Sequence, residues 1–166
     1  MPSDELRKMT KEELFFENET RKHQHEVSRC MIALAQAILA RALGHDKSKF
    51  GEFEREGFVK YTPMLRKTEY GSEEYKKCLE ELKPTLSHHY FQNSHHPEYY
   101  KGDDPVGMMN IVDLLEMFCD WHSAAQRHKE GSTEKSIEIN QERFNLSDQL
   151  ASILRNTIKY LGEGNA

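Results

Sequence analysis

Apolar residues recur at spacings of three and four along most of the chain, which is the pattern of amphipathic helices. Between residues 11 and 42 they form a stripe that we expect to face the core: Val27, Cys30, Met31, Leu34 and Ile38. Thr10 can cap the start of this helix, and Gly44 can end it. Alternating strand-like patterns are missing. The chain therefore predicts an all-α fold.

Capping residues, prolines and glycines delimit the other expected helices. We place these helices at residues 49–61, 72–90, 105–129, 134–143 and 148–161. Pro63 lies just beyond the first of them, Pro84 kinks or restarts the second, and Gly131 stops the third. The chain has no low-complexity linker and no internal repeat, so residues 1–166 predict a single helical domain.

Charge and cysteine content narrow the possible partners and compartment. The net charge of −5 argues against binding to nucleic acid or to an anionic membrane. No apolar run approaches the ~20 residues of a membrane span. Three cysteines without CxxC spacing indicate free thiols, so we expect a cytoplasmic protein. Tyrosines such as Tyr99 and Tyr100 either line a cleft or a dimer surface, or they are ordinary half-buried helix residues. A homodimer is therefore one possible oligomeric state.

The pair His45–Asp46 follows the first helix directly, and Lys49 comes three positions later. An imidazole and a carboxylate can bind one divalent metal ion, and a lysine in the same turn can reach a phosphate oxygen. The pair also has a structural explanation, because Asp46 or Ser48 can cap the next helix. These features suggest a metal-dependent hydrolase that acts on a small phosphate-containing molecule.

Helical phase distinguishes two histidines of the first helix. His23 lies within about 40° of Val27, Cys30 and Leu34, so it shares the apolar stripe. His25 lies on the opposite side and is expected to be solvated. A histidine on the apolar stripe is either a core residue bonded to a backbone carbonyl or a metal ligand. His23 is therefore the better ligand candidate of the two.

Four histidines fall within nine residues, as His88–His89 and His95–His96. Such a density of imidazoles suits a divalent transition metal, namely zinc, iron, manganese or nickel, as one or two ions. Adjacent side chains on a helix point about 100° apart, so one histidine of each pair is expected to bind the ion directly. A polar, histidine-rich loop is the alternative interpretation.

Three carboxylates lie on one face of the helix expected at 105–129. Asp113, Glu116 and Asp120 are spaced at i, i+3 and i+7, and Arg127 extends the same face. Like charges on one stripe repel unless a cation lies opposite them, whereas a solvated acidic face is the common explanation. Asp113 can replace Asp120 as a ligand, because the two share the face.

In order, His23, His45–Asp46, the histidine cluster and Asp120 resemble the H…HD…H…H…D signature of the HD-domain superfamily. Its members are all-helical and mostly metal-dependent phosphohydrolases of nucleotides. The string from His45 to Lys49 is similar to the HDxxK variant of cyclic-dinucleotide phosphodiesterases. The whole chain also resembles an uncharacterised family of small bacterial and phage proteins. That resemblance rests on the motifs HxxxV, HDxSK, HHxxxNxHHPE and EMxCDW, which begin at His23, His45, His88 and Glu116.

The resemblance implies an HD-like helical bundle with a defined set of site residues. The metal ligands would be His23, His45, Asp46, His89, His95 and Asp120. Substrate would be bound by Lys49, His96 and Arg127. Asp46 would orient or deprotonate the attacking water, with Lys49 on the phosphate and Glu116 as a reserve base. We expect a metal-dependent phosphohydrolase of a nucleotide or another phosphate ester. The alternatives are a non-catalytic metal- or nucleotide-binding protein and a di-iron HD-type oxygenase.

Overall fold

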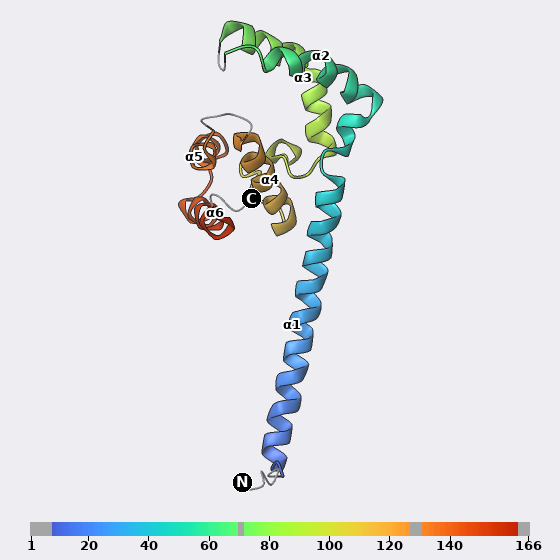
Figure 1. The fold of residues 1–166 in the computed structure, drawn as a ribbon, viewed down its shortest axis with the longest axis vertical. Helices are drawn as coiled ribbons and strands as arrows, with labels where there is room; N and C mark the ends of the chain where they lie inside the picture. The colour runs from blue at the N-terminus through green and yellow to red at the C-terminus, as the bar shows by residue number, and fades with distance from the viewer. Residues whose placement is uncertain (1–7, 70–71, 127–130, 163–166) are drawn as a thin grey trace, which may run out of the picture. The chain divides into compact units, whose positions relative to one another are not determined.

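The computed structural model describes residues 8–69, 72–126 and 131–162. Within these ranges the chain forms α-helices and short 3₁₀ helices and no strand, which confirms the all-α fold class (Figure 1). The elements are α1 (Lys11–Gly44), η1 (Lys47–Phe50), α2 (Glu52–Leu65), α3 (Glu73–Gln92), η2 (Pro97–Tyr99), α4 (Ile111–Gln126), α5 (Thr133–Phe144) and α6 (Asp148–Leu161). The contacts divide the chain into two units, Met1–Ala40 and Arg41–Ala166.

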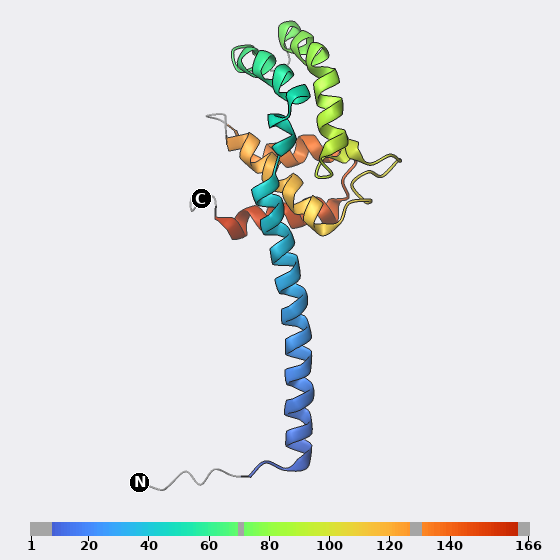
Figure 2. The same cartoon turned by 90° about the vertical axis from the view of Figure 1, so that its right-hand side faces the viewer.

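The first unit holds most of α1, a single long helix (Figure 2). Its start matches the expectation: the Thr10 hydroxyl accepts a bond from the Glu13 backbone N–H at 3.1 Å, and Glu13 Oε2 accepts one from the Thr10 N–H at 2.8 Å. No residue of α1 is buried. The stripe expected to face the core is therefore exposed, with Val27 at 42% and Leu34 at 47%. Within this unit the described residues supply no second element for the stripe to pack against.

Together with the turn that follows it, up to Phe50, α1 is long and apolar enough to cross a membrane by length and composition. This differs from the expectation that no segment of the chain meets the requirement for a span. The criterion has little weight alone, because the core helix of a soluble protein and a signal sequence meet it as well. The expected absence of a membrane partner stays a prediction.

In the second unit α2 and α3 pack along each other as a helical hairpin (Figure 1). Tyr61, Cys78 and Leu82 form its buried apolar core. Both prolines lie inside helices, so the expected helix end before Pro63 is wrong, and Pro84 neither ends nor restarts α3. The buried positions of α3 continue past Pro84 at helical spacing: Cys78, Leu82, Thr85 and His89. Each proline lacks a backbone N–H and therefore one helical hydrogen bond. The free energy gained by packing the two helices offsets this loss.

A second apolar cluster joins α4, α5 and α6. Phe118 of α4, Ile137 of α5 and Leu154 of α6 are at most 3% exposed within it. Ser132 and Ser147 cap α5 and α6 through their side chains, accepting bonds from Lys135 N and Leu150 N, so both helices lie close to the expected ranges.

The predicted start of α4 at Pro105 is wrong, because the helix begins at Ile111. Asp104 closes a local turn instead, with its Oδ1 accepting a bond from Gly107 N at 2.9 Å. Asn110 Oδ1 accepts bonds from the backbone N–H groups of Val112 and Asp113, and so caps the helix. The predicted helix end at Lys129 lies outside the described residues.

We predict that Gly57→Ala lowers stability, because Gly57 of α2 packs directly against Thr85 of α3. A Cβ added there would lie 2.1 Å from Thr85 Oγ1. Overpacking of this kind costs about 1–3 kcal/mol, measured as the free energy of unfolding in urea. Gly44→Ala is the control, since no atom lies within 4 Å of its added Cβ. Equal stability of the two variants would contradict the close approach.

Candidate metal centre

His45 and Asp46 lie at the junction between α1 and η1, inside the second unit. Asp46 has a left-handed backbone, with φ 55°, and this turns the chain out of α1 into η1. Few residues other than glycine adopt this conformation, and aspartate is one that does. His45 Nε2 lies 3.4 Å from Asp46 Oδ2, so the two adjacent side chains reach the same place.

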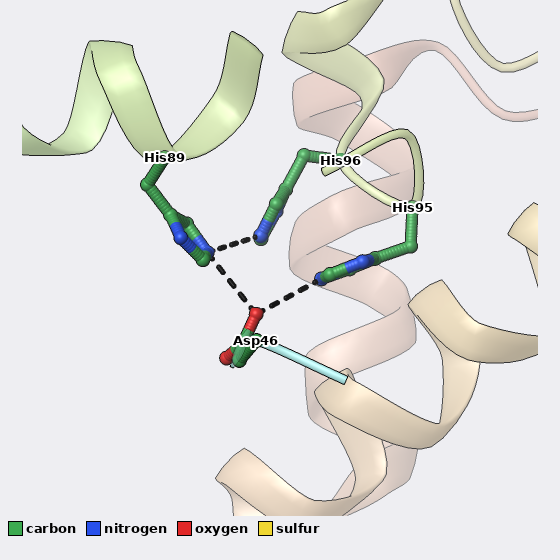
Figure 3. Close-up of side chains that lie close together, drawn as sticks. All are labelled: Asp46, His89, His95 and His96. Carbon is green, nitrogen blue, oxygen red and sulfur yellow. Dashed lines mark hydrogen bonds and ion pairs between the residues drawn. The ribbon is translucent and has the colours of Figure 1, made fainter. Parts of the chain in front are cut away.

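Asp46 meets three histidines from α3 and from the segment that follows it (Figure 3). Asp46 Oδ1 lies 3.2 Å from His89 Nε2 and 3.5 Å from His95 Nε2. His89 Nε2 lies 3.0 Å from His96 Nε2. One potential ligand atom from each of the four residues falls within 4.8 Å of all the others. Four donors at this mutual distance can hold one metal ion.

Buried carboxylates hold the outer nitrogens of three of the histidines. His89 Nδ1 lies 2.9 Å from Oε2 of Glu54, which is 1% exposed. His45 Nδ1 and His95 Nδ1 lie 3.0 Å and 3.2 Å from Glu116 Oε1. Because a carboxylate accepts, each Nδ1 carries the proton and donates it, which leaves each neutral ring with a lone pair on Nε2. This is the second-shell arrangement found around metal-binding histidines.

Three buried polar atoms have no hydrogen-bond partner among the described residues: Asp46 Oδ1, His95 Nε2 and Glu116 Oε2. Leaving such atoms unpaired is costly, and each needs an explanation. Two of them, Asp46 Oδ1 and His95 Nε2, lie where the ligand atoms of the four-residue group converge. His89 Nε2 presents a lone pair at the same place. A cation bound there would satisfy these atoms and remove the repulsion between neighbouring lone pairs.

The protonation states at neutral pH suit metal binding. Burial lowers the pKa of His95 to about 4 and that of His96 to about 3, so both rings are neutral. Burial alone would raise the pKa of Asp46, but the hydrogen bond and the positive charge of the Lys49 ammonium counteract it, and that pKa lies well below its ordinary value. Metal ligands must be neutral imidazoles and ionised carboxylates, and these residues meet that requirement.

A second set of donors adjoins the first. His45, Asp46 and Asp120 form one possible group, and His45, His95 and Glu116 form another. His45 Nε2 lies 3.7 Å from Asp120 Oδ1. Asp46 belongs to the first of these groups and to the four-residue group, and His95 belongs to the second and to the four-residue group. The site therefore extends continuously from His96 to Asp120 and has donors for one ion or two.

Asp113 and Asp120 share a helix face but have different surroundings. Asp113 is 1% exposed and accepts hydrogen bonds from Arg41, Ser94, Tyr100 and Asn110. Four donors occupy its two oxygens, and no candidate metal group among the described residues includes it. Asp120 is part of such a group. The geometry therefore favours Asp120 as the ligand, and Asp113 as a structural carboxylate.

Lys49 lies beside the site. Its Nζ is 2.5 Å from Asp46 Oδ2 and 5.1 Å from the centre of the Phe58 ring. Its side chain is about one-third exposed, so the ammonium is accessible from solvent as well as from the site. This position agrees with a contact to an anionic group bound next to Asp46.

The donor groups described above do not include two residues of the expected set. His23 is exposed on the part of α1 that belongs to the first unit, and no candidate metal group in the described ranges includes it. Arg127 lies outside the described residues. The roles implied for His23 and Arg127 stay predictions.

Sequence reasoning missed the residues that orient the ligands. Glu54 receives bonds from His88, His89 and Ser48 at 2.8–2.9 Å, and Asn93 Nδ2 donates to Ser48 Oγ. Ser48 and Asn93 are part of the motifs HDxSK and HHxxxNxHHPE, and that was a usable signal. Glu54 had none, because it stands in a charged segment of α2 and becomes buried only through its contact with α3.

The fold and the site define an all-helical protein with histidine–carboxylate clusters that can hold a metal ion. One family model matches residues 12–160 and is described as a family of unknown function, DUF5662; the chain belongs to this family. No curated protein and no solved structure matched the chain in the two other comparisons.

We predict that Glu54→Gln weakens metal binding, because the carboxylate that fixes the His89 tautomer is lost. Loss of such a partner typically reduces metal affinity by about 10- to 100-fold. Calorimetric titration with Zn²⁺ and Mn²⁺ would measure it, with the fold checked by circular dichroism. Glu56→Gln, at an exposed position of the same helix, is the control. A folded Glu54→Gln protein with unchanged affinity would contradict this role.

Proposed function

We propose that this protein is a metal-dependent phosphohydrolase that acts on a small phosphate ester. The observation that carries the proposal is the convergence of the Nε2 atoms of His89 and His95 on Asp46 Oδ1, next to the Lys49 ammonium. A cation position beside the Lys49 ammonium suits a bound phosphoryl group, which carries negative charge on several oxygens. The resemblance of His45–Asp46 and the histidine cluster to the HD-domain superfamily supports the same conclusion.

The ligands we propose are His45, Asp46, His89, His95, His96 and Asp120, all of them in the second unit. A mixture of imidazoles and carboxylates suits zinc, iron, manganese or nickel, as one or two ions. Bound there, such an ion would lower the pKa of a water molecule and polarise a phosphoryl oxygen. A thiolate site is not involved, since no cysteine belongs to these groups among the described residues.

The roles of the surrounding residues follow from their positions. Lys49 would transfer its contact from Asp46 Oδ2 to a phosphoryl oxygen and offset the charge that develops there. Asp46 Oδ2, released by the lysine, would then orient the attacking water. The low pKa of Asp46 makes it a better ligand and orienting group than base. Water adds its oxygen to phosphorus, the ester P–O bond breaks, and the leaving alcohol takes up a proton.

Glu116 has a different role from the reserve base that the sequence suggested. Its Oε1 accepts from both His45 and His95, so it orients two imidazoles at once. Its Oε2 lies 3.2 Å from Arg41 Nη1, which neutralises its charge. A carboxylate held in this way is poorly placed to take a proton from water, so we assign Glu116 a positioning role.

Removal of the metal is predicted to abolish hydrolysis. The purified protein should contain zinc, iron, manganese or nickel by elemental analysis. Dialysis against a chelator should eliminate turnover of 4-nitrophenyl phosphate, and one of these metals should restore it. Asp46→Asn and His45→Ala should lower both metal content and activity, while the exposed His25→Ala serves as the control.

Three outcomes would overturn the proposal. Bound metal without turnover of any ester in a panel of phosphomonoesters and phosphodiesters would indicate a binding protein. Iron with oxygen uptake would indicate an oxygenase. Full metal occupancy in the His45→Ala/Asp46→Asn double variant would remove the proposed ligand set.

Lys49→Ala is predicted to lower kcat by about 100- to 1,000-fold, the range for loss of one donor to the charge that develops in a transition state. The metal content should be unchanged, because the lysine is not a ligand. Lys47→Ala, two residues away and exposed, is the matched control. Loss of metal in parallel with activity would assign Lys49 to support of Asp46 instead of contact with phosphate.

A further inference from the structure

A cavity of about 250 Å³ adjoins the metal centre on the side of α4 and α5. His96 and Asp120, both proposed ligands, form part of its wall. It is also lined by Trp121, Asn140, Arg143 and Phe144. A group attached to a phosphate at the metal centre would therefore lie beside this cavity.

Two aromatic side chains, Trp121 and Phe144, form part of the cavity wall. The rings of Trp121 and Phe144 are parallel within 4°, with their centroids 6.1 Å apart. The Arg143 guanidinium carbon lies 4.6 Å from the centre of the Phe144 ring. An aromatic side chain in a cavity wall can cover the C–H face of a ring-shaped ligand.

The remaining wall offers hydrogen-bonding groups. Glu98 and Tyr90 line the cavity with Asn140 and Ser136. The cavity thus combines acceptors and donors that suit the hydroxyl groups of a ligand.

The charges in the cavity do not favour a second anionic group. Arg143 Nη2 lies 2.6 Å from Glu98 Oε1, so these two charges neutralise each other. Asp120 adds negative charge at the end next to the metal centre. An uncharged group with hydroxyls therefore fits better than a second phosphate or a carboxylate.

Size limits the ligand further. Pockets for drug-sized ligands usually measure roughly 300–1,000 Å³, and this cavity lies below that range. It suits a single sugar ring better than a complete nucleoside. Carboxylates bond sugar hydroxyls in other binding sites, as the acidic residue of dinucleotide-binding folds does with ribose.

We propose that this cavity holds the alcohol part of the substrate, and that this part is a monosaccharide, so that the substrate is a sugar monophosphate. The inference rests on the proposed function. In the reaction, the oxygen of water bonds to phosphorus, the P–O bond to the sugar breaks, and the sugar oxygen takes a proton. The products are the free sugar and inorganic phosphate.

Trp121 is the single tryptophan of the chain, so its fluorescence reports occupation of this cavity without need of turnover. Ribose 5-phosphate should change the fluorescence saturably, and inorganic phosphate should not. Glu98→Gln should weaken ribose 5-phosphate about tenfold, as expected for loss of a hydrogen bond to a charged acceptor. Glu134→Gln is the matched control, because it removes the carboxylate of another arginine pair, with Arg155, away from the cavity.

Hydrolysis assays separate this inference from the proposed function. The wild-type protein should hydrolyse sugar monophosphates with a higher kcat/KM than adenosine monophosphate. Glu98→Gln should lower kcat/KM for ribose 5-phosphate about tenfold but leave 4-nitrophenyl phosphate within about twofold, since that leaving group offers no hydroxyl donor.

Each outcome has a defined meaning. Saturable binding of ribose 5-phosphate without hydrolysis of any ester would overturn the proposed function and retain the sugar site. Hydrolysis of 4-nitrophenyl phosphate with no fluorescence response to ribose 5-phosphate would overturn the sugar site and retain the proposed function. An equal effect of Glu98→Gln on every ester, or a preference for adenosine monophosphate, would also overturn the sugar site.

Discussion

The candidate site depends on hydrogen bonds from imidazole rings to two buried carboxylates. Glu54 and Glu116 fix the outer nitrogens of His45, His89 and His95, and every inner nitrogen is left as an acceptor. A buried carboxylate is costly unless donors surround it, so the histidines stabilise the glutamates as much as the glutamates orient the histidines. The inner lone pairs then face one another, and this arrangement favours a bound cation.

A neighbouring network secures the same region of the chain. Asp113 binds Arg41, which precedes His45, and also Ser94 and Tyr100, which flank the histidines after α3. Arg41 in turn contacts Glu116. The end of α1, the loop after α3 and the start of α4 are therefore held by one buried ion cluster. These contacts tie together the backbone segments that carry the ligands.

The fold class and much of the site follow from local patterns in the sequence. Apolar spacing predicts the helices, Thr10 marks the start of α1 correctly, and the His45–Asp46 pair meets the histidine cluster as expected. The start of α4 could not be predicted, because Asp104–Pro105 and Asn110 are both reasonable helix starts. Asp113 and Asp120 share one helix phase, so only their contacts with other elements distinguish them. Glu54 becomes a partner of His89 only when α2 packs against α3.

The left-handed backbone of Asp46 places a second demand on the central residue of the site. The residue at this position must tolerate a positive φ. It must also carry a carboxylate that can bind a cation beside the imidazole lone pairs. Glutamate would supply the charge but resists this conformation, glycine would adopt the conformation but supply no ligand, and asparagine would satisfy the backbone alone. Aspartate is the residue type that meets both demands. The metal chemistry of the site and the backbone conformation therefore both constrain the identity of residue 46.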